Sequence, residues 1–175
     1  GRQAVNLLAI DTSGPVCGAA VLMEGRVAYE GAAVNKLTHS VNLLPMIDEG
    51  LTRAGLSVGQ IDLYAAVVGP GSFTGLRIGI AAVKGLAWAA DKPCLGVSTL
   101  EAMAQNAAHI DGLIVGAMDA RRSQVYNAVF EAKAGSLTRL TPDRAISLEE
   151  LCAQLEGKAQ RITVLGDGGV LCWRY

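Results

Sequence analysis

The chain reads Val67-Val68-Gly69-Pro70-Gly71-Ser72-Phe73-Thr74-Gly75-Leu76-Arg77-Ile78-Gly79-Ile80 at the point that most constrains its fold. A β-branched run ends at a Gly-Pro-Gly turn. Ser72 or Thr74 then offers a hydroxyl N-cap for an apolar segment that continues to Trp88. A strand, a glycine turn and a helix start in this order present backbone N–H groups to an anion, or they launch a helix that packs closely on a neighbour.

Apolar runs and turn residues before and after this stretch predict a regular order of elements. Three strands joined by short turns come first, and a helix that opens at Thr38-His39-Ser40 and closes at Gly55 follows them. After the glycine turn and its helix come a short strand and a helix capped by Ser98 or Thr99. The predicted strands of this half cover residues 5–10, 17–23, 26–34, 62–68 and 94–97.

The second half repeats the beginning of the first. Residues 113–118 and 124–132 predict a hairpin, 137–144 a further strand, and Ser147 caps a helix over 148–155. A last strand, 161–165, enters Gly166-Asp167-Gly168-Gly169, and no closing helix is predicted after it. We therefore expect an α/β protein in which a mixed sheet carries helices on its faces. It would have an N-terminal subdomain over 1–110 and a C-terminal subdomain over 111–175 that is incomplete at its C-terminus.

Composition excludes several classes of function. The formal net charge of this 175-residue chain is −1 and its basic residues are dispersed, which disfavours binding to nucleic acid without a partner. No signal peptide is apparent, and the longest apolar run, 78–90, contains Lys84 and is too short for a bilayer. A cytoplasmic protein without a membrane segment is the expectation.

Cysteine and histidine spacing gives no metal or nucleophile motif. The four cysteines form no C-x-x-C pair, which favours reduced, buried thiols. His39 and His109 lie in no zinc-type motif, and no serine lies in a G-x-S-x-G elbow. We expect no metal, no cofactor and no catalytic residue in this chain itself.

Five segments, in this order, resemble the TsaB (YeaZ) family of the actin-like and Hsp70-like ATPase superfamily, whose halves each carry a ribonuclease-H-like sheet. They are Leu7-Leu8-Ala9-Ile10-Asp11-Thr12-Ser13, His39-Ser40 with Leu43-Leu44-Pro45-Met46-Ile47, Gly69 to Gly79, Gly96-Val97-Ser98-Thr99-Leu100, and Asp119-Ala120-Arg121-Arg122 with Val125-Tyr126. The resemblance covers nearly the whole chain, and family members are longer at the C-terminus.

The resemblance implies a role in forming N6-threonylcarbamoyladenosine at position 37 of tRNAs that read codons starting with A. In that family the protein is a non-catalytic subunit that dimerises with the related transferase TsaD, which holds the metal. A TsaE-like ATPase joins the two, TsaC makes the adenylate, and tRNA is met only through the complex. ATP and metal are thus expected on the partners, and a homodimer is expected when the partner is absent.

Asp11-Thr12-Ser13 is a candidate for a remnant of a nucleotide site. In active superfamily members an Asp at this position orients a metal-bound water, and a following glycine lets phosphate approach. Here Thr12 and Ser13 follow the Asp, and a carboxylate that caps its own turn is the ordinary explanation. We interpret the three residues as structural.

The helix after the glycine turn instead suggests a docking surface. Gly75, Gly79 and Ala82 form a stripe of small residues, and the opposite side is also apolar, so this helix must be covered on more than one side. With the first helix it predicts half of a four-helix interface, although the two helices would also satisfy this pattern by packing on their own sheet. The predicted interface residues are Leu43, Leu44, Ile47, Gly75, Leu76, Gly79, Ile80 and Val83.

Two other hypotheses stay open at this point. The chain would be a small ATPase or kinase if a working nucleotide cleft lay between its halves. It would be a homodimeric interaction module without a role in tRNA modification if the helices served only self-association.

Overall fold

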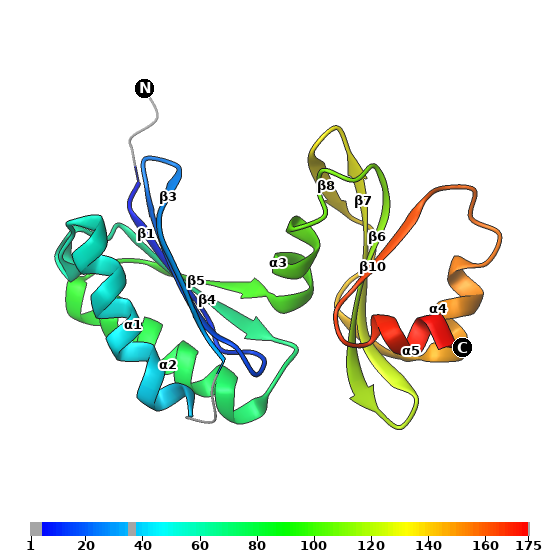
Figure 1. The fold of residues 1–175 in the computed structure, drawn as a ribbon, viewed down its shortest axis with the longest axis horizontal. Coiled ribbons are helices and arrows are strands. Elements are labelled where there is room, and N and C mark those ends of the chain that lie inside the picture. Colours follow the sequence, from blue (N-terminus) through cyan, green and yellow to red (C-terminus); the bar gives the residue numbers. More distant parts are fainter. Residues whose placement is uncertain (1–4, 35–37, 175) are drawn as a thin grey trace. The chain divides into compact units, whose positions relative to one another are not determined.

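The computed structural model describes residues 5–34 and 38–174, which form two compact units, Gly1–Val97 and Ser98–Tyr175 (Figure 1). Each unit is built around a mixed β-sheet with helices packed on it. This is the α/β arrangement that the order of elements predicts, and it agrees with the ribonuclease-H-like sheets that the family resemblance implies.

The sheet of the first unit has the strand order β3-β2-β1-β4-β5. β1 pairs antiparallel with β2, which pairs antiparallel with β3, and β1 pairs parallel with β4. The glycine turn therefore follows the strand next to β1. The strands are β1 (Leu7–Asp11), β2 (Cys17–Met23), β3 (Arg26–Ala33), β4 (Leu63–Gly69) and β5 (Cys94–Ser98).

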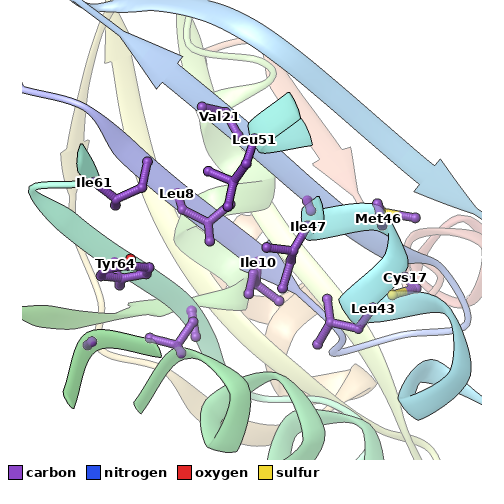
Figure 2. Close-up of a cluster of buried hydrophobic side chains, with 14 residues drawn as sticks. Leu8, Ile10, Cys17, Val21, Leu43, Met46, Ile47, Leu51, Ile61 and Tyr64 are labelled. Atoms are coloured by element: carbon purple, nitrogen blue, oxygen red, sulfur yellow. The ribbon is translucent and has the colours of Figure 1, made fainter. Parts of the chain in front are cut away.

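Two long helices, α1 (His39–Ala54) and α2 (Phe73–Ala90), cover one face of this sheet, and a short 3-10 helix η1 (Val58–Gln60) precedes β4. Ser72 caps α2, since its hydroxyl oxygen accepts the N–H of Gly75, and Gly55 ends α1 in the left-handed conformation. Both caps agree with the sequence prediction. Figure 2 shows the core between the sheet and α1, which includes Leu8, Ile10, Val21, Leu43, Ile47, Leu51 and Tyr64.

The sheet of the second unit has the order β10-β6-β7-β8, and β9 also pairs with β7. Read from β8, this order repeats the first four positions of the first unit, including the parallel pairing of β10 with β6. The strand predicted over 137–144 is instead two strands, β8 and β9. The strands are β6 (Gly112–Arg121), β7 (Gln124–Lys133), β8 (Ser136–Arg139), β9 (Arg144–Ser147) and β10 (Ile162–Leu165).

Helices lie on both faces of the second sheet. α3 (Thr99–Gln105) packs on the face that carries Ile114 and Phe130, and α4 (Leu148–Leu155) on the face that carries Val115 and Val125. A short helix, α5 (Gly169–Arg174), follows β10. The prediction that no helix follows the last strand was therefore wrong. Gly166 to Gly169 form the turn before this helix.

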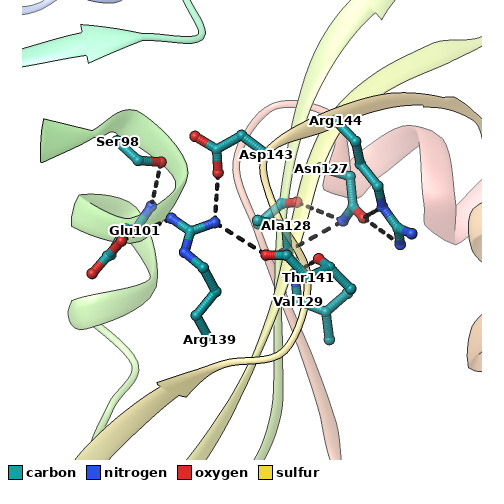
Figure 3. Close-up of polar contacts among 10 residues, drawn as sticks. Ser98, Glu101, Asn127, Ala128, Val129, Arg139, Thr141, Asp143 and Arg144 are labelled. Atoms are coloured by element: carbon teal, nitrogen blue, oxygen red, sulfur yellow. Dashed lines mark hydrogen bonds and ion pairs between the residues drawn. The ribbon is translucent and has the colours of Figure 1, made fainter.

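The boundary between the units lies at Val97/Ser98, before α3, whereas the sequence pattern places it at residue 110. The reason is that Leu100 and Ala104 of α3 bury their side chains against Ile114 and Phe130. Figure 3 shows a polar clamp at the same helix: the Arg139 guanidinium pairs with Glu101 at 2.8 Å and with Asp143 at 2.7 Å. α3 therefore belongs to the second unit.

Candidate functional site

The parallel pairing of β1 with β4 brings the predicted Asp11-Thr12-Ser13 segment and the glycine turn together. The backbone N–H of Ser72 donates to the carbonyl oxygen of Ser13 at 2.7 Å. The Thr12 hydroxyl donates to the carbonyl oxygen of Gly75, also at 2.7 Å. Thr12 and Ser13 are both buried. The end of β1 is therefore tied to the first turn of α2 by one backbone and one side-chain hydrogen bond.

The glycines of this turn and helix allow the close approach of β1. A Cβ atom at Gly75 would collide with the backbone oxygen of Thr12, and one at Gly79 with the Thr12 hydroxyl. A Cβ atom at Gly71 would lie 2.5 Å from the backbone oxygen of Ser13. The space that a side chain at these three glycines would need is thus occupied by Thr12 and Ser13.

Asp11 caps its own turn, as the sequence predicts. Its Oδ1 atom accepts the backbone N–H of Ser13 at 2.9 Å and the Ser13 hydroxyl at 2.6 Å. The ring of His39, at the start of α1, lies with Nε2 2.7 Å from the carbonyl oxygen of Gly14. Burial, with a smaller effect from Asp11, raises the pKa of the Cys17 thiol, which keeps this thiol protonated.

In the second unit, different residues connect a glycine turn to the first strand of the sheet in the same way. The backbone N–H of Gly168, after β10, donates to the carbonyl oxygen of Ala117 in β6 at 3.0 Å. Asp167 Oδ1 accepts the backbone N–H of Asp119 at 2.9 Å. A Cβ atom at Gly166 would collide with the Ala117 oxygen. In both units, the glycine turn after the strand that pairs parallel with the first strand closes against that first strand.

Five of the eight predicted interface residues face the interior of the first unit. They are Leu43, Ile47, Gly75, Gly79 and Val83, all of which are buried. The small-residue stripe is therefore explained by packing on β1, so these five side chains offer no surface to a partner. Leu44 is 60% exposed, and Leu76 and Ile80 are half-buried, so these three stay candidates.

The exposed side of the two helices holds apolar residues that the sequence prediction did not include. Val41 is 54% exposed and Phe73 is 70% exposed, and the Arg77 guanidinium carbon lies 3.7 Å from the centroid of the Phe73 ring. α1 and α2 begin at the same end of the sheet, where the His39 ring approaches Gly75. Helical spacing from Leu44 and Leu76 was the available signal. We call this set the helix-pair surface: Val41, Leu44, Phe73, Leu76, Arg77 and Ile80.

The described residues were also searched for metal sites and for helices that could span a membrane. Within residues 5–34 and 38–174, no group of three His, Cys, Asp or Glu side chains is placed to hold a metal ion. No helix in the same ranges has the length and apolar character needed to cross a membrane. Of the cysteines, Cys17 is buried as expected, whereas Cys94 is exposed at the sheet edge.

Comparison with known protein families gives one match over most of the chain. Residues 33–165 match the family model described as TsaD: tRNA N6-adenosine threonylcarbamoyltransferase. This range includes both helices of the helix-pair surface and extends to the end of β10.

Curated relatives carry a second name. The chain is 38% identical over 162 residues to the tRNA threonylcarbamoyladenosine biosynthesis protein TsaB of Bacillus subtilis, covering 93% of this chain and 71% of the relative. It is 40% identical over 155 residues to the protein of the same name from Haemophilus influenzae, covering 86% of this chain and 65% of that one. This chain is therefore similar to only part of each relative.

A solved structure is also similar to this chain. YeaZ from Pseudomonas aeruginosa superposes with a TM-score of 0.74 at 36% sequence identity, over 81% of this chain and 67% of that one.

Proposed function

The chain belongs to the TsaB (YeaZ) family, and from this membership we propose that it is a non-catalytic partner subunit in the formation of tRNA threonylcarbamoyladenosine. Its relatives are named for that biosynthesis, and the family model that it matches is named for the transferase. In the proposal the chemical step belongs to a TsaD-like partner, and this chain supplies a docking surface. A cytoplasmic location and contact with tRNA only through the complex belong to the same proposal.

The observation that carries the non-catalytic part is the closed glycine turn. Because Gly71, Gly75 and Gly79 lack side chains, Thr12 and Ser13 can lie close to them. The Asp11 carboxylate is hydrogen-bonded within its own turn. The glycines of this turn are thus explained by their close packing on residues 12 and 13, which favours a structural role over phosphate binding. The glycine turn of the second unit is closed in the same way.

The helix-pair surface supports the docking part of the proposal. Soluble proteins rarely leave several large apolar side chains together in water, and such groups commonly mark interfaces. Val41, Leu44 and Phe73 are more than half exposed at the shared end of α1 and α2. A TsaD-like partner is suggested because residues 33–165, which include α1 and α2, match the family model named for TsaD.

Reconstitution tests the proposal. Purified chain is mixed with a TsaD-like transferase, a TsaE-like ATPase, an adenylate source and tRNA, and threonylcarbamoyladenosine is quantified by mass spectrometry of the digested tRNA. We expect a heterodimer by size exclusion and modification that depends on the chain. Calorimetry of the chain alone with ATP and Mg²⁺ should give little or no heat. ATP hydrolysis by the isolated chain would instead support the kinase-like alternative.

A further inference from the structure

Two of the four cysteines lie on helices of the second unit that pack against each other. Cys152 belongs to α4 and Cys172 to α5, and both residues are half-buried. Figure 1 shows the two helices close together, and Cα atoms of one approach Cα atoms of the other within 8 Å. This separation is close to the span of about 4.4 to 6.8 Å between the Cα atoms of a disulfide. The fold therefore brings together two helices that each carry one thiol.

Both cysteines lie on the sides of their helices that face the core. In α4, Cys152 follows the buried Leu148 by four residues, and this helical spacing puts the two side chains on the same side. In α5, Cys172 packs on the cluster that contains Leu148, whereas Val170 is 57% exposed and Trp173 is 91% exposed. Each thiol is thus on the side of its helix that contacts the shared apolar cluster.

The titration of Cys172 agrees with this arrangement. Burial raises the pKa of the Cys172 thiol, and the charge that Cys152 carries as a thiolate raises it further. The Cys172 thiol is therefore protonated at neutral pH and reacts only when α5 moves away from the core. Such opening is expected of a helix with six residues, none of which is fully buried.

We propose that Cys152 and Cys172 form a thiol–disulfide switch that joins α5 to α4 when the chain meets a low-molecular-weight disulfide such as oxidised glutathione. One cysteine thiolate attacks a sulfur of oxidised glutathione, so that a mixed disulfide forms and one glutathione thiolate leaves. The second cysteine thiolate attacks the protein sulfur of this mixed disulfide, which forms the Cys152–Cys172 bond and releases the second glutathione. The two protons that the cysteines lose are taken up by the two glutathione thiolates. The cysteine pair is oxidised and glutathione disulfide is reduced.

The bond would also restrain the glycine turn that precedes α5. The backbone N–H of Gly168 in this turn donates to the carbonyl oxygen of Ala117 in β6, and α5 continues directly from the turn. A disulfide would close a loop over residues 152–172 and reduce the conformational freedom of the unfolded chain. The midpoint of thermal unfolding should therefore rise by at least about 4 °C on oxidation. This inference does not depend on the proposed function.

Peptide mapping tests the switch on the full chain. The reduced chain is incubated in glutathione buffers of increasing oxidised fraction, its remaining thiols are blocked with N-ethylmaleimide, and it is digested with trypsin. Trypsin places the two cysteines in separate peptides, 145–158 and 162–174, and mass spectrometry without reduction should find these peptides joined. Cys152→Ser and Cys172→Ser should each abolish the joined peptide. Cys94→Ser, which removes the exposed cysteine of β5, is the matched control and should retain it.

The same experiment on the chain unfolded in urea separates proximity in the fold from chance collision. Joining the peptides there should need at least about tenfold more oxidised glutathione than in the folded chain. An equal requirement would overturn the proposal, as would a folded chain in which both cysteines carry only glutathione or in which Cys94 is a partner in the bond. A joined peptide without a rise in the unfolding midpoint would overturn the effect on α5.

Discussion

The Thr12 hydroxyl donates a 2.7 Å hydrogen bond to the carbonyl oxygen of Gly75, which fastens the end of β1 to the first turn of α2. Because Thr12 is buried and lies against both Gly75 and Gly79, one threonine occupies the surface along two turns of the helix. A segment that resembles a phosphate loop in sequence is thereby converted into a packed joint. The energetic role of this joint can be measured separately from any role in binding.

Gly75→Ala should lower the free energy of unfolding by about 1 to 3 kcal/mol, the usual range for overpacking. The added Cβ would collide with the backbone oxygen of Thr12, which cannot rotate away. Gly85→Ala, in the same helix, is the matched control, since a Cβ there meets no atom within 4 Å. That variant should gain about 0.5 to 1 kcal/mol from helix propensity. Urea denaturation followed by circular dichroism measures the free energy of unfolding of both variants. Equal changes in the two would show that the close contact between Gly75 and Thr12 does not contribute to stability.

Thr12→Val should lower the free energy of unfolding by about 1 kcal/mol, because the isosteric side chain keeps the packing and loses the hydrogen bond to Gly75. Thr52→Val, at an exposed position of α1, is the control and should change stability by less than about 0.5 kcal/mol. The same denaturation measurement applies. A Thr12 variant as stable as the control would mean that the hydrogen bond adds nothing to the fold.

Much of the fold followed from residue patterns. Ser72 and Ser147 cap their helices and Gly55 ends α1, as predicted. These ends could be predicted because a cap depends on a local hydroxyl group or on the absence of a side chain. The mixed sheet with helices on its faces followed from three strands in succession and the α/β units after them. α3 was assigned to the wrong unit because its amphipathic pattern does not say which of two sheets it covers.

The candidate site was harder to predict. Gly75 and Gly79 form a stripe whether the surface opposite is a partner or the protein's own strand, and helical periodicity alone does not distinguish these cases. The structure assigns both to β1. Phe73 was missed although it lies three residues before Leu76, at helical spacing, and its stacking with Arg77 requires coordinates.

Leu44→Arg should leave stability within about 0.5 kcal/mol of the wild type, since its side chain is exposed. It should weaken binding to a TsaD-like partner at least tenfold, because a charge would be placed in the apolar centre of the helix-pair surface. Leu43→Ala is the contrasting variant and should cost about 2 to 5 kcal/mol of stability, as expected for a buried leucine. If Leu44→Arg bound the partner normally, the helix-pair surface would not be the interface.

Stability should fall in acid partly through Asp62. The hydrogen bond from the Asn6 backbone N–H, helped by Lys92, holds the pKa of the Asp62 carboxyl below its ordinary value of 3.8. The unfolded chain therefore binds a proton before the folded one does, so this contribution is present above about pH 4 and is lost as the pH falls through the folded pKa. Asp62→Asn should flatten the pH dependence of the denaturation midpoint between about pH 5 and 2. An unchanged slope would contradict this role.

The most direct test of the non-catalytic role is the reconstituted tRNA modification assay with the Asp11→Asn variant. The amide oxygen still accepts the two hydrogen bonds from Ser13, whereas the negative charge that would orient a metal-bound water is removed. We predict that the variant forms the heterodimer and supports threonylcarbamoyladenosine formation at a rate similar to that of the wild type. Loss of modification with an intact heterodimer would contradict the account, because it would assign Asp11 to the chemistry.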